Sequence, residues 1–259
     1  MKMDEIPLWL LFLGTILLVV GTIELGYLLG QAARRRSAEE KEPPVSAIAG
    51  TVLALLAFIL AFTFGIVADR YDARRELVRD QADAIRTAYL SADFLPEPGR
   101  TESKDLFHSY VATVVQVAHS GHFSDNLDEI AELQTIQAQL WDIAAANVQG
   151  GDTSDTSSFY AESLTDVNNV LATRIAVSVQ SRLPPGLWLV LYVLVALAMV
   201  AVGYQTAIAD SRRTWAMIVL ALSFSIVIVL IAALDDPERG YIPISQQPMR
   251  DLQTELSAS

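Results

Sequence analysis

Residues 45–68 form an uncharged apolar stretch that decides the architecture, and they read VSAIAGTVLALLAFILAFTFGIVA. A helix needs about 20 apolar residues to cross the hydrocarbon core of a bilayer. Three further stretches meet that length, at residues 7–30, 187–208 and 214–234. Because lipid offers no hydrogen-bond partner to the backbone, each stretch is expected to be helical. The sequence therefore predicts an all-α membrane protein with four transmembrane helices.

A polar segment, residues 69–186, separates the second and third apolar stretches and carries twice as many acidic as basic residues. Helical spacing of four side chains predicts that the second transmembrane helix continues into it: Tyr71, Val78, Ile85 and Tyr89. The run LPEPG at residues 95–99 is expected to end that helix. Three more helices are predicted, at residues 103–121, 125–148 and 156–182. The prediction is a polar helical domain inserted between the second and third transmembrane helices, with a polar C-terminal tail at residues 235–259.

Composition excludes several classes of function. The formal net charge of -12 argues against nucleic-acid binding, which requires a basic face. The chain has no cysteine, so disulfides, thiolate metal sites and cysteine nucleophiles are excluded. No phosphate loop or G-x-S-x-G motif is present, so we expect neither an enzyme nor a cofactor. His119 and His122 are followed by Asp125, but two histidines around Gly121 are interpreted as surface residues rather than a metal site.

Three motifs carry a resemblance to a known family. They are LAFTFG at residues 60–65 followed by RYDARR at 70–75, AIRTAYL at 84–90 leading into LPEP, and LDDP at 234–237. With the layout of two helices, an insert and two helices, they resemble the bacterial bestrophin-like family. That family is distantly similar to bestrophins, which are pentameric anion channels. The resemblance implies a homo-oligomeric channel, with a pentamer as the favoured form, in the bacterial inner (plasma) membrane.

The second transmembrane helix holds the candidate pore. Small side chains recur along it at steps of three and four: Ala47, Gly50, Ala54, Ala57, Ala61, Gly65 and Ala68. They indicate tight helix packing, within one subunit or between subunits, or a smooth face toward a pore. Phe58, Phe62 and Ile66 lie at steps of four, which fits lipid-facing or core packing. The resemblance to bestrophins favours a hydrophobic gate instead. Thr51 and Thr63 are further pore-lining candidates.

Charged side chains supply the remaining candidate sites. Arg70, Arg74 and Arg75 follow the second transmembrane helix, where they form either a salt-bridged helix surface or a ring at a pore mouth that concentrates anions. Arg79 and Arg86 continue this run, and the acids interleaved with the arginines, Asp83 among them, lie at helical pairing distance. Glu24 is a carboxylate inside the first apolar stretch, and it either handles ions or protons or reaches the membrane surface.

The leading hypothesis is an oligomeric ion channel that conducts anions, with further copies of itself, the lipid bilayer and small inorganic ions as partners. Four helices are too few to enclose a wide pore, so the pore is expected on a symmetry axis, lined by the second transmembrane helix. The alternative is a non-conducting sensor or scaffold that acts through its helical domain. The short connections at residues 31–45 and 209–213 are rich in Lys and Arg, which predicts an extracytoplasmic helical domain. The resemblance to bestrophins implies the reverse orientation.

Overall fold

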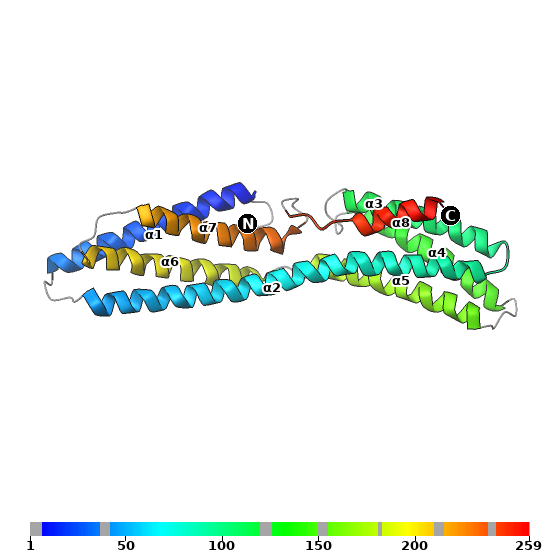
Figure 1. The fold of residues 1–259 in the computed structure, drawn as a ribbon, viewed down its shortest axis with the longest axis horizontal. Helices are drawn as coiled ribbons and strands as arrows, with labels where there is room; N and C mark the ends of the chain where they lie inside the picture. The colour runs from blue at the N-terminus through cyan, green and yellow to red at the C-terminus, as the bar shows by residue number, and fades with distance from the viewer. Residues whose placement is uncertain are drawn as a thin grey trace. The chain divides into compact units, whose positions relative to one another are not determined.

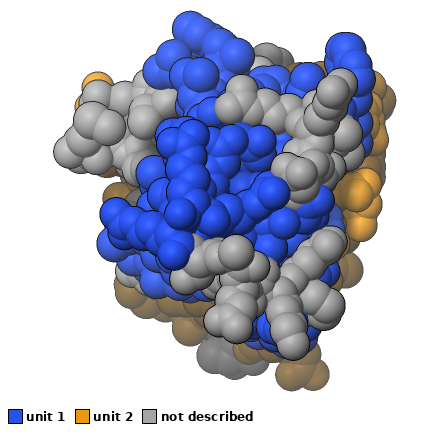
Figure 2. Space-filling model, turned by 90° about the vertical axis from the view of Figure 1, so that its left-hand side faces the viewer, with its two compact units in different colours: residues 1–69, 183–236 blue, residues 70–182, 237–259 orange. Residues whose placement is uncertain are grey.

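The computed structural model of the chain describes residues 7–36, 42–119, 126–149, 155–180, 183–209, 215–237 and 242–258. All the regular structure in these ranges is helical. The chain divides into two compact units, coloured separately in Figure 2. Unit 1 comprises residues 1–69 and 183–236, and unit 2 comprises residues 70–182 and 237–259.

Unit 1 contains the apolar helices α1 (Leu8–Arg36), α6 (Pro185–Ile208) and α7 (Trp215–Asp235), together with the first part of α2 (Glu42–Ser91) (Figure 1). Four helices of the described residues are long and apolar enough to cross a membrane, as the sequence predicted. Helix α1 continues past the predicted end at residue 30 to Arg36. There, Nη1 of Arg34 donates a hydrogen bond of 3.0 Å to the carbonyl oxygen of Ala207 near the end of α6. An arginine in this position supplies a further hydrogen-bond donor to the carbonyl groups of the last turn of α6.

Helices α1 and α6 approach each other so closely that their contact requires glycine. A Cβ atom built on Gly26 would lie 2.1 Å from the carbonyl oxygen of Val200, and one on Gly203 would lie 2.0 Å from that of Ile23. A Cβ on Gly30 would lie 2.7 Å from Cβ of Ala207. Small residues allow this approach, and close van der Waals packing is what holds helices together in lipid.

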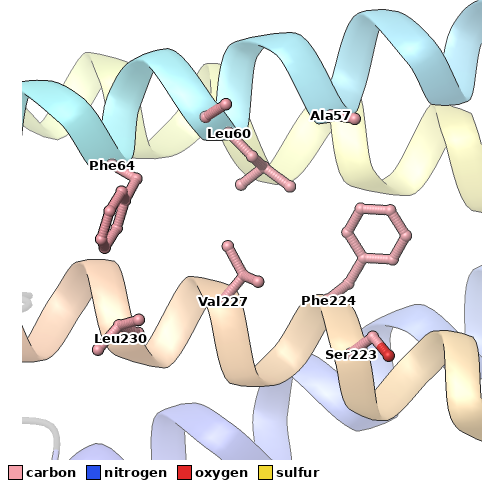
Figure 3. Close-up of a pocket in the computed structure, with 8 residues that line it drawn as sticks. Ala57, Leu60, Phe64, Ser223, Phe224, Val227 and Leu230 are labelled. Carbon is pink, nitrogen blue, oxygen red and sulfur yellow. The ribbon is translucent and has the colours of Figure 1, made fainter.

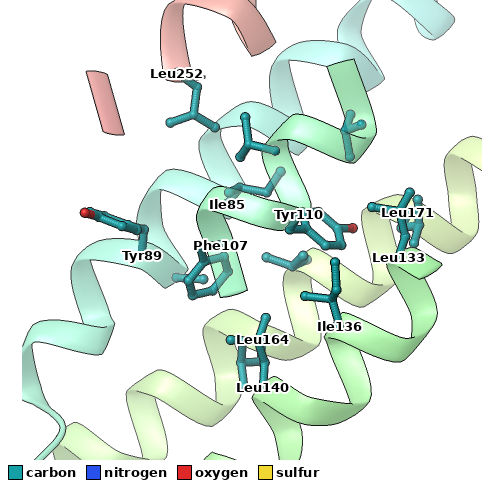
Figure 4. Packing of buried hydrophobic residues seen from close by; sticks show 14 of the residues in the cluster. Ile85, Tyr89, Phe107, Tyr110, Leu133, Ile136, Leu140, Leu164, Leu171 and Leu252 are labelled. Atoms are coloured by element: carbon teal, nitrogen blue, oxygen red, sulfur yellow. The ribbon is translucent and has the colours of Figure 1, made fainter. Parts of the chain in front are cut away.

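Unit 2 is a helical domain that contains the second part of α2, the 3-10 helix η2 (Ala92–Phe94), α3 (Gly99–His119), α4 (Leu127–Gln149), α5 (Asp155–Gln180) and α8 (Gln247–Ala258). Helix α2 is a single helix of 50 residues, which confirms that the second transmembrane helix continues outward. Helix α2 ends at Ser91, and η2 follows it to Phe94, directly before the predicted LPEPG run, where Leu95 is extended. Figure 4 shows apolar side chains of these helices meeting in one cluster, with Phe107, Leu133 and Leu140 almost fully buried.

A partly buried polar network links the helices of unit 2. Arg174 on α5 donates one hydrogen bond to Oε1 of Gln81 on α2 and another, of 3.0 Å, to Oε1 of Gln246. Nε2 of Gln137 on α4 donates a hydrogen bond of 3.0 Å to the hydroxyl of Tyr110 on α3. Burial raises the pKa of Tyr110 to about 12, although the neighbouring amides and the charge of Arg174 oppose the shift. The tyrosine therefore stays protonated at physiological pH, so it buries no charge.

The C-terminal residues form part of the core of unit 2. The sequence suggested a polar tail over residues 235–259, but Gln247–Ala258 is the helix α8. Met249, Leu252 and Leu256 lie on one face of α8 and are almost completely buried in the cluster. Nε of Arg86 on α2 also lies 3.0 Å from a carboxylate oxygen of Glu255. Burial of these three apolar side chains stabilises α8 in the core. The average hydropathy of the segment is polar, so it does not reveal the amphipathic pattern.

Candidate functional site: the outward face of helix α2

One face of α2 packs inside unit 1. Leu56, Leu60 and Val67 on this face are at most 4% exposed. At about 100° per residue, these positions fall within a narrow sector of the helix. Residue Ser46, near the start of α2, accepts a hydrogen bond of 3.0 Å from Nε2 of Gln205 on α6. The side of α2 opposite this packed face therefore points away from the other helices of unit 1.

The opposite face of α2 carries the candidate gate residues. Phe58 and Phe62 are 66% and 63% exposed, Thr51 is exposed, and Ile66 is partly buried. At about 100° per residue, Phe58 lies roughly opposite the mean direction of the packed face. Thr63 is different, because it is 8% exposed and donates a hydrogen bond of 2.8 Å to the carbonyl oxygen of Ile59. The structure therefore brings Phe58, Phe62 and Thr51 to one surface but places Thr63 in the core.

The stripe of small residues also lies on the outward side of α2. Its alanines in this part of the helix are exposed: Ala47, Ala54, Ala57 and Ala61. Gly50 is exposed and Gly65 is partly buried, and a Cβ atom built on either would meet nothing within 4 Å. These two glycines are therefore not required by any contact within the described part of the chain. The close glycine packing of unit 1 is found between α1 and α6 instead.

A groove of about 490 Å³ runs between α2 and α7 beside this outward face. Ala57, Ala61 and Phe64 line it from α2, and Phe224 and Val227 line it from α7. Figure 3 shows Phe64 pointing toward α7 at one end and Phe224 pointing toward α2 at the other. The lining is almost entirely apolar, so the groove suits a hydrocarbon or aromatic group rather than an ion.

The charged candidates occupy different environments. Glu24 is partly buried on α1 and takes part in interactions within the chain. Arg70 and Arg74 are partly buried, whereas Arg75 is exposed. Further along α2, Nη1 of Arg86 lies 2.6 Å from a carboxylate oxygen of Asp83, so at least one of the predicted acid–arginine pairs is formed. Of the three pore-mouth candidates, Arg75 is therefore the one that the fold leaves at the surface.

No group of three or more potential metal ligands occurs among the residues that the structure describes. His122 and Asp125 lie outside those residues, and His119 is the last residue of α3. The third histidine, His108, packs edge-on against the ring of Tyr89 at 5.8 Å between ring centroids.

Comparison with known proteins decides the family. The model of the Bestrophin-like domain matches residues 16–249, which is most of the chain. The chain belongs to the Bestrophin-like family. With its four apolar helices, this family member is a membrane protein.

A solved structure shares the fold of this Bestrophin-like chain. It is the crystal structure of a bacterial bestrophin homologue from Klebsiella pneumoniae that carries a mutation. The match has a TM-score of 0.63 at 14% sequence identity and covers 96% of this chain and 99% of the other. At that identity the likeness establishes the fold alone. None of the curated proteins matches the sequence.

Asp235, within the LDDP motif, makes a contact that the sequence alone did not predict. Asp235 ends α7 and is 8% exposed. Its carboxylate accepts the backbone N–H of Leu183 at 2.9 and 3.2 Å, just before α6 begins. The bond joins two segments far apart in sequence, so no local pattern could have predicted it. An aspartate directly after a long apolar run was the available signal, because a carboxylate so close to the membrane requires a partner.

Proposed function

We propose that this Bestrophin-like chain assembles into a ring of identical copies that conducts ions, with helix α2 of each copy lining the pore. The observation that carries the proposal is the outward face of α2, where Phe58, Phe62 and Thr51 are exposed together on one surface of a membrane-spanning helix. Four membrane-spanning helices are too few to enclose a wide pore within one copy, so the pore would lie on the symmetry axis.

Phe58 is the best gate candidate within this proposal. It points directly away from the packed face of its own subunit, so in a ring it would approach the axis most closely. A ring of aromatic side chains closes a pore by excluding water, without any charged group. Thr51 lies two turns away on the same exposed surface and would supply hydroxyl groups to the lumen. Phe62 lies about 40° to one side of Phe58, at the edge of the lumen.

Anions are the proposed permeant ions. Bestrophins, which the family resembles, are anion channels, and the run of arginines that follows the membrane-spanning part of α2 supplies positive charge. Arg75 is exposed, so its guanidinium can attract anions at a pore mouth. Acidic residues dominate unit 2, so the local arginines rather than the net charge of the chain would determine selectivity.

Planar-bilayer recording of the purified protein tests the proposal. We expect single-channel steps whose reversal potential follows the chloride gradient when sodium is replaced by a large cation. Mass measurement in nanodiscs, made on the same preparation, should give a multiple of the chain mass. An oligomer without current would favour the non-conducting scaffold, and a monomer would refute both the ring and the shared pore.

A further inference from the structure

The groove between α2 and α7 has a matching ridge on the other side of α2. Phe62 and Leu55 form this ridge and are 63% and 50% exposed. At about 100° per residue, Phe62 lies about 40° to one side of Phe58, and Ala61, on the lip of the groove, lies about 60° to the other. Ridge and groove therefore flank the direction in which Phe58 points.

These angles, about 40° for the ridge and about 60° for the lip of the groove, are close to the ones that a closed ring of helices requires. When Phe58 points to the axis, the two neighbouring helices lie on either side of that direction by about 45–60° for rings of about four to six copies. Rotational symmetry about the membrane normal also requires the two complementary surfaces to lie at the same depth. Ala61 and Phe62 are consecutive residues, so their depths differ by only about 1.5 Å.

We propose that Phe62 of one copy inserts into the groove between α2 and α7 of the next copy, over Ala57 and Ala61. The occupant of the groove is thus a second copy of this chain, and the inference rests on the proposed ring. The small residues give the aromatic ring room to enter, and Phe64 and Phe224 bound it along the groove. Phe58 then faces the lumen, while Phe62 contributes to the contact between neighbouring copies of the oligomer.

The area of the contact suits a ring better than an isolated dimer. Phe62 and Phe64 are 63% and 37% exposed, so together they expose about as much surface as one whole aromatic side chain, roughly 150–250 Å². This aromatic contact alone is far smaller than the about 1,200 Å² of a standard pairwise interface. In a closed ring every copy makes the contact twice, once with its ridge and once with its groove.

Cysteine cross-linking tests the placement directly, because the natural chain has no cysteine. The double variant A61C/F62C, oxidised in membranes, should give a ladder of covalent multimers. Each single variant should remain monomeric on denaturing gels, because the contact joins two different surfaces. Efficient dimers from F62C alone would show a symmetric contact and overturn the proposal.

A size swap provides the second test. Ala61→Phe fills the groove and Phe62→Ala removes the ridge, so each should reduce the oligomeric fraction in nanodiscs at least several-fold. The double variant A61F/F62A places the large side chain on the opposite flank and should restore assembly. Leu17→Phe is the control, because Leu17 on α1 is 72% exposed and lies outside the groove. If the wild type is oligomeric and neither Ala61→Phe nor Phe62→Ala reduces its assembly, this placement is refuted and the proposed ring still stands. A monomeric wild type would refute both.

Discussion

Replacing Gly26 with alanine should separate helices α1 and α6. The added Cβ atom would lie 2.1 Å from the carbonyl oxygen of Val200, whereas ordinary van der Waals contact begins at 3.4 Å. The two helices must therefore part by about 1.3 Å, since a backbone carbonyl cannot rotate away as a flexible side chain can. A gap of about 0.5–1 Å already forfeits a quarter to a half of the dispersion energy of the atoms that it separates. We expect a loss of about 1–3 kcal/mol in the free energy of unfolding.

Gly21→Ala is the matched control on the same helix. A Cβ atom at Gly21 would meet nothing within 4 Å. This substitution should be neutral or should stabilise the helix by up to about 1 kcal/mol, since alanine has the higher helix propensity. Reversible unfolding in bicelles, followed by steric trapping, measures both free energies. Equal stability of the two variants would refute the reasoning, because it would mean that α1 and α6 do not touch at Gly26.

Further predictions concern the gate, the orientation, the domain core and the end of α7. Phe58→Ala should raise the basal current in bilayers, because removing bulk from a hydrophobic constriction admits water; unchanged conductance would place the gate elsewhere. Single cysteines in place of Ser154 and Ser37, both outside the described residues, should report the orientation of the chain. A membrane-impermeant maleimide on whole cells should label position 154 and spare position 37. The opposite pattern would support the orientation of bestrophins. Because burial raises the pKa of Tyr110 to about 12, its contribution to stability is complete below pH 10 and is lost as the pH rises toward 12, so Tyr110→Phe should reduce the fall in melting temperature over that interval. Asp235→Ala should destabilise unit 1 by about 1–3 kcal/mol because the backbone N–H of Leu183 loses its acceptor, and Asp235→Asn, which keeps an acceptor oxygen, should retain part of that stability in the same unfolding assay.

The small-residue stripe of α2 shows where sequence reasoning stopped. Its spacing places the small residues on one face of a helix, but it could not indicate whether that face packs against the same chain. The structure places the stripe on the outward side and assigns the close glycine contact to α1 and α6 instead. Gly26 and Gly203 take part in that contact although they are far apart in sequence, so the pairing depends on how the helices dock.

The C-terminal segment shows the opposite failure. Met249, Leu252 and Leu256 follow steps of three and four, so the helical pattern was present in the sequence. The surrounding residues are polar, so the composition of the segment alone predicts a polar tail rather than a core helix. Only the cluster of unit 2, which receives these three side chains, shows that α8 belongs to a core.

By itself, the sequence determined the membrane class, the four apolar helices, the length of α2 and the family resemblance, because the bilayer imposes long uncharged stretches whatever the fold. The tertiary structure decided which face of each helix is covered. In the folded chain Thr63 is buried, Phe58 and Phe62 are exposed, and the carboxylate of Asp235 accepts a hydrogen bond from the backbone N–H of Leu183. The physical reason is that the hydropathy of a segment depends only on its own residues, whereas burial and hydrogen bonding depend on neighbours that only folding brings together.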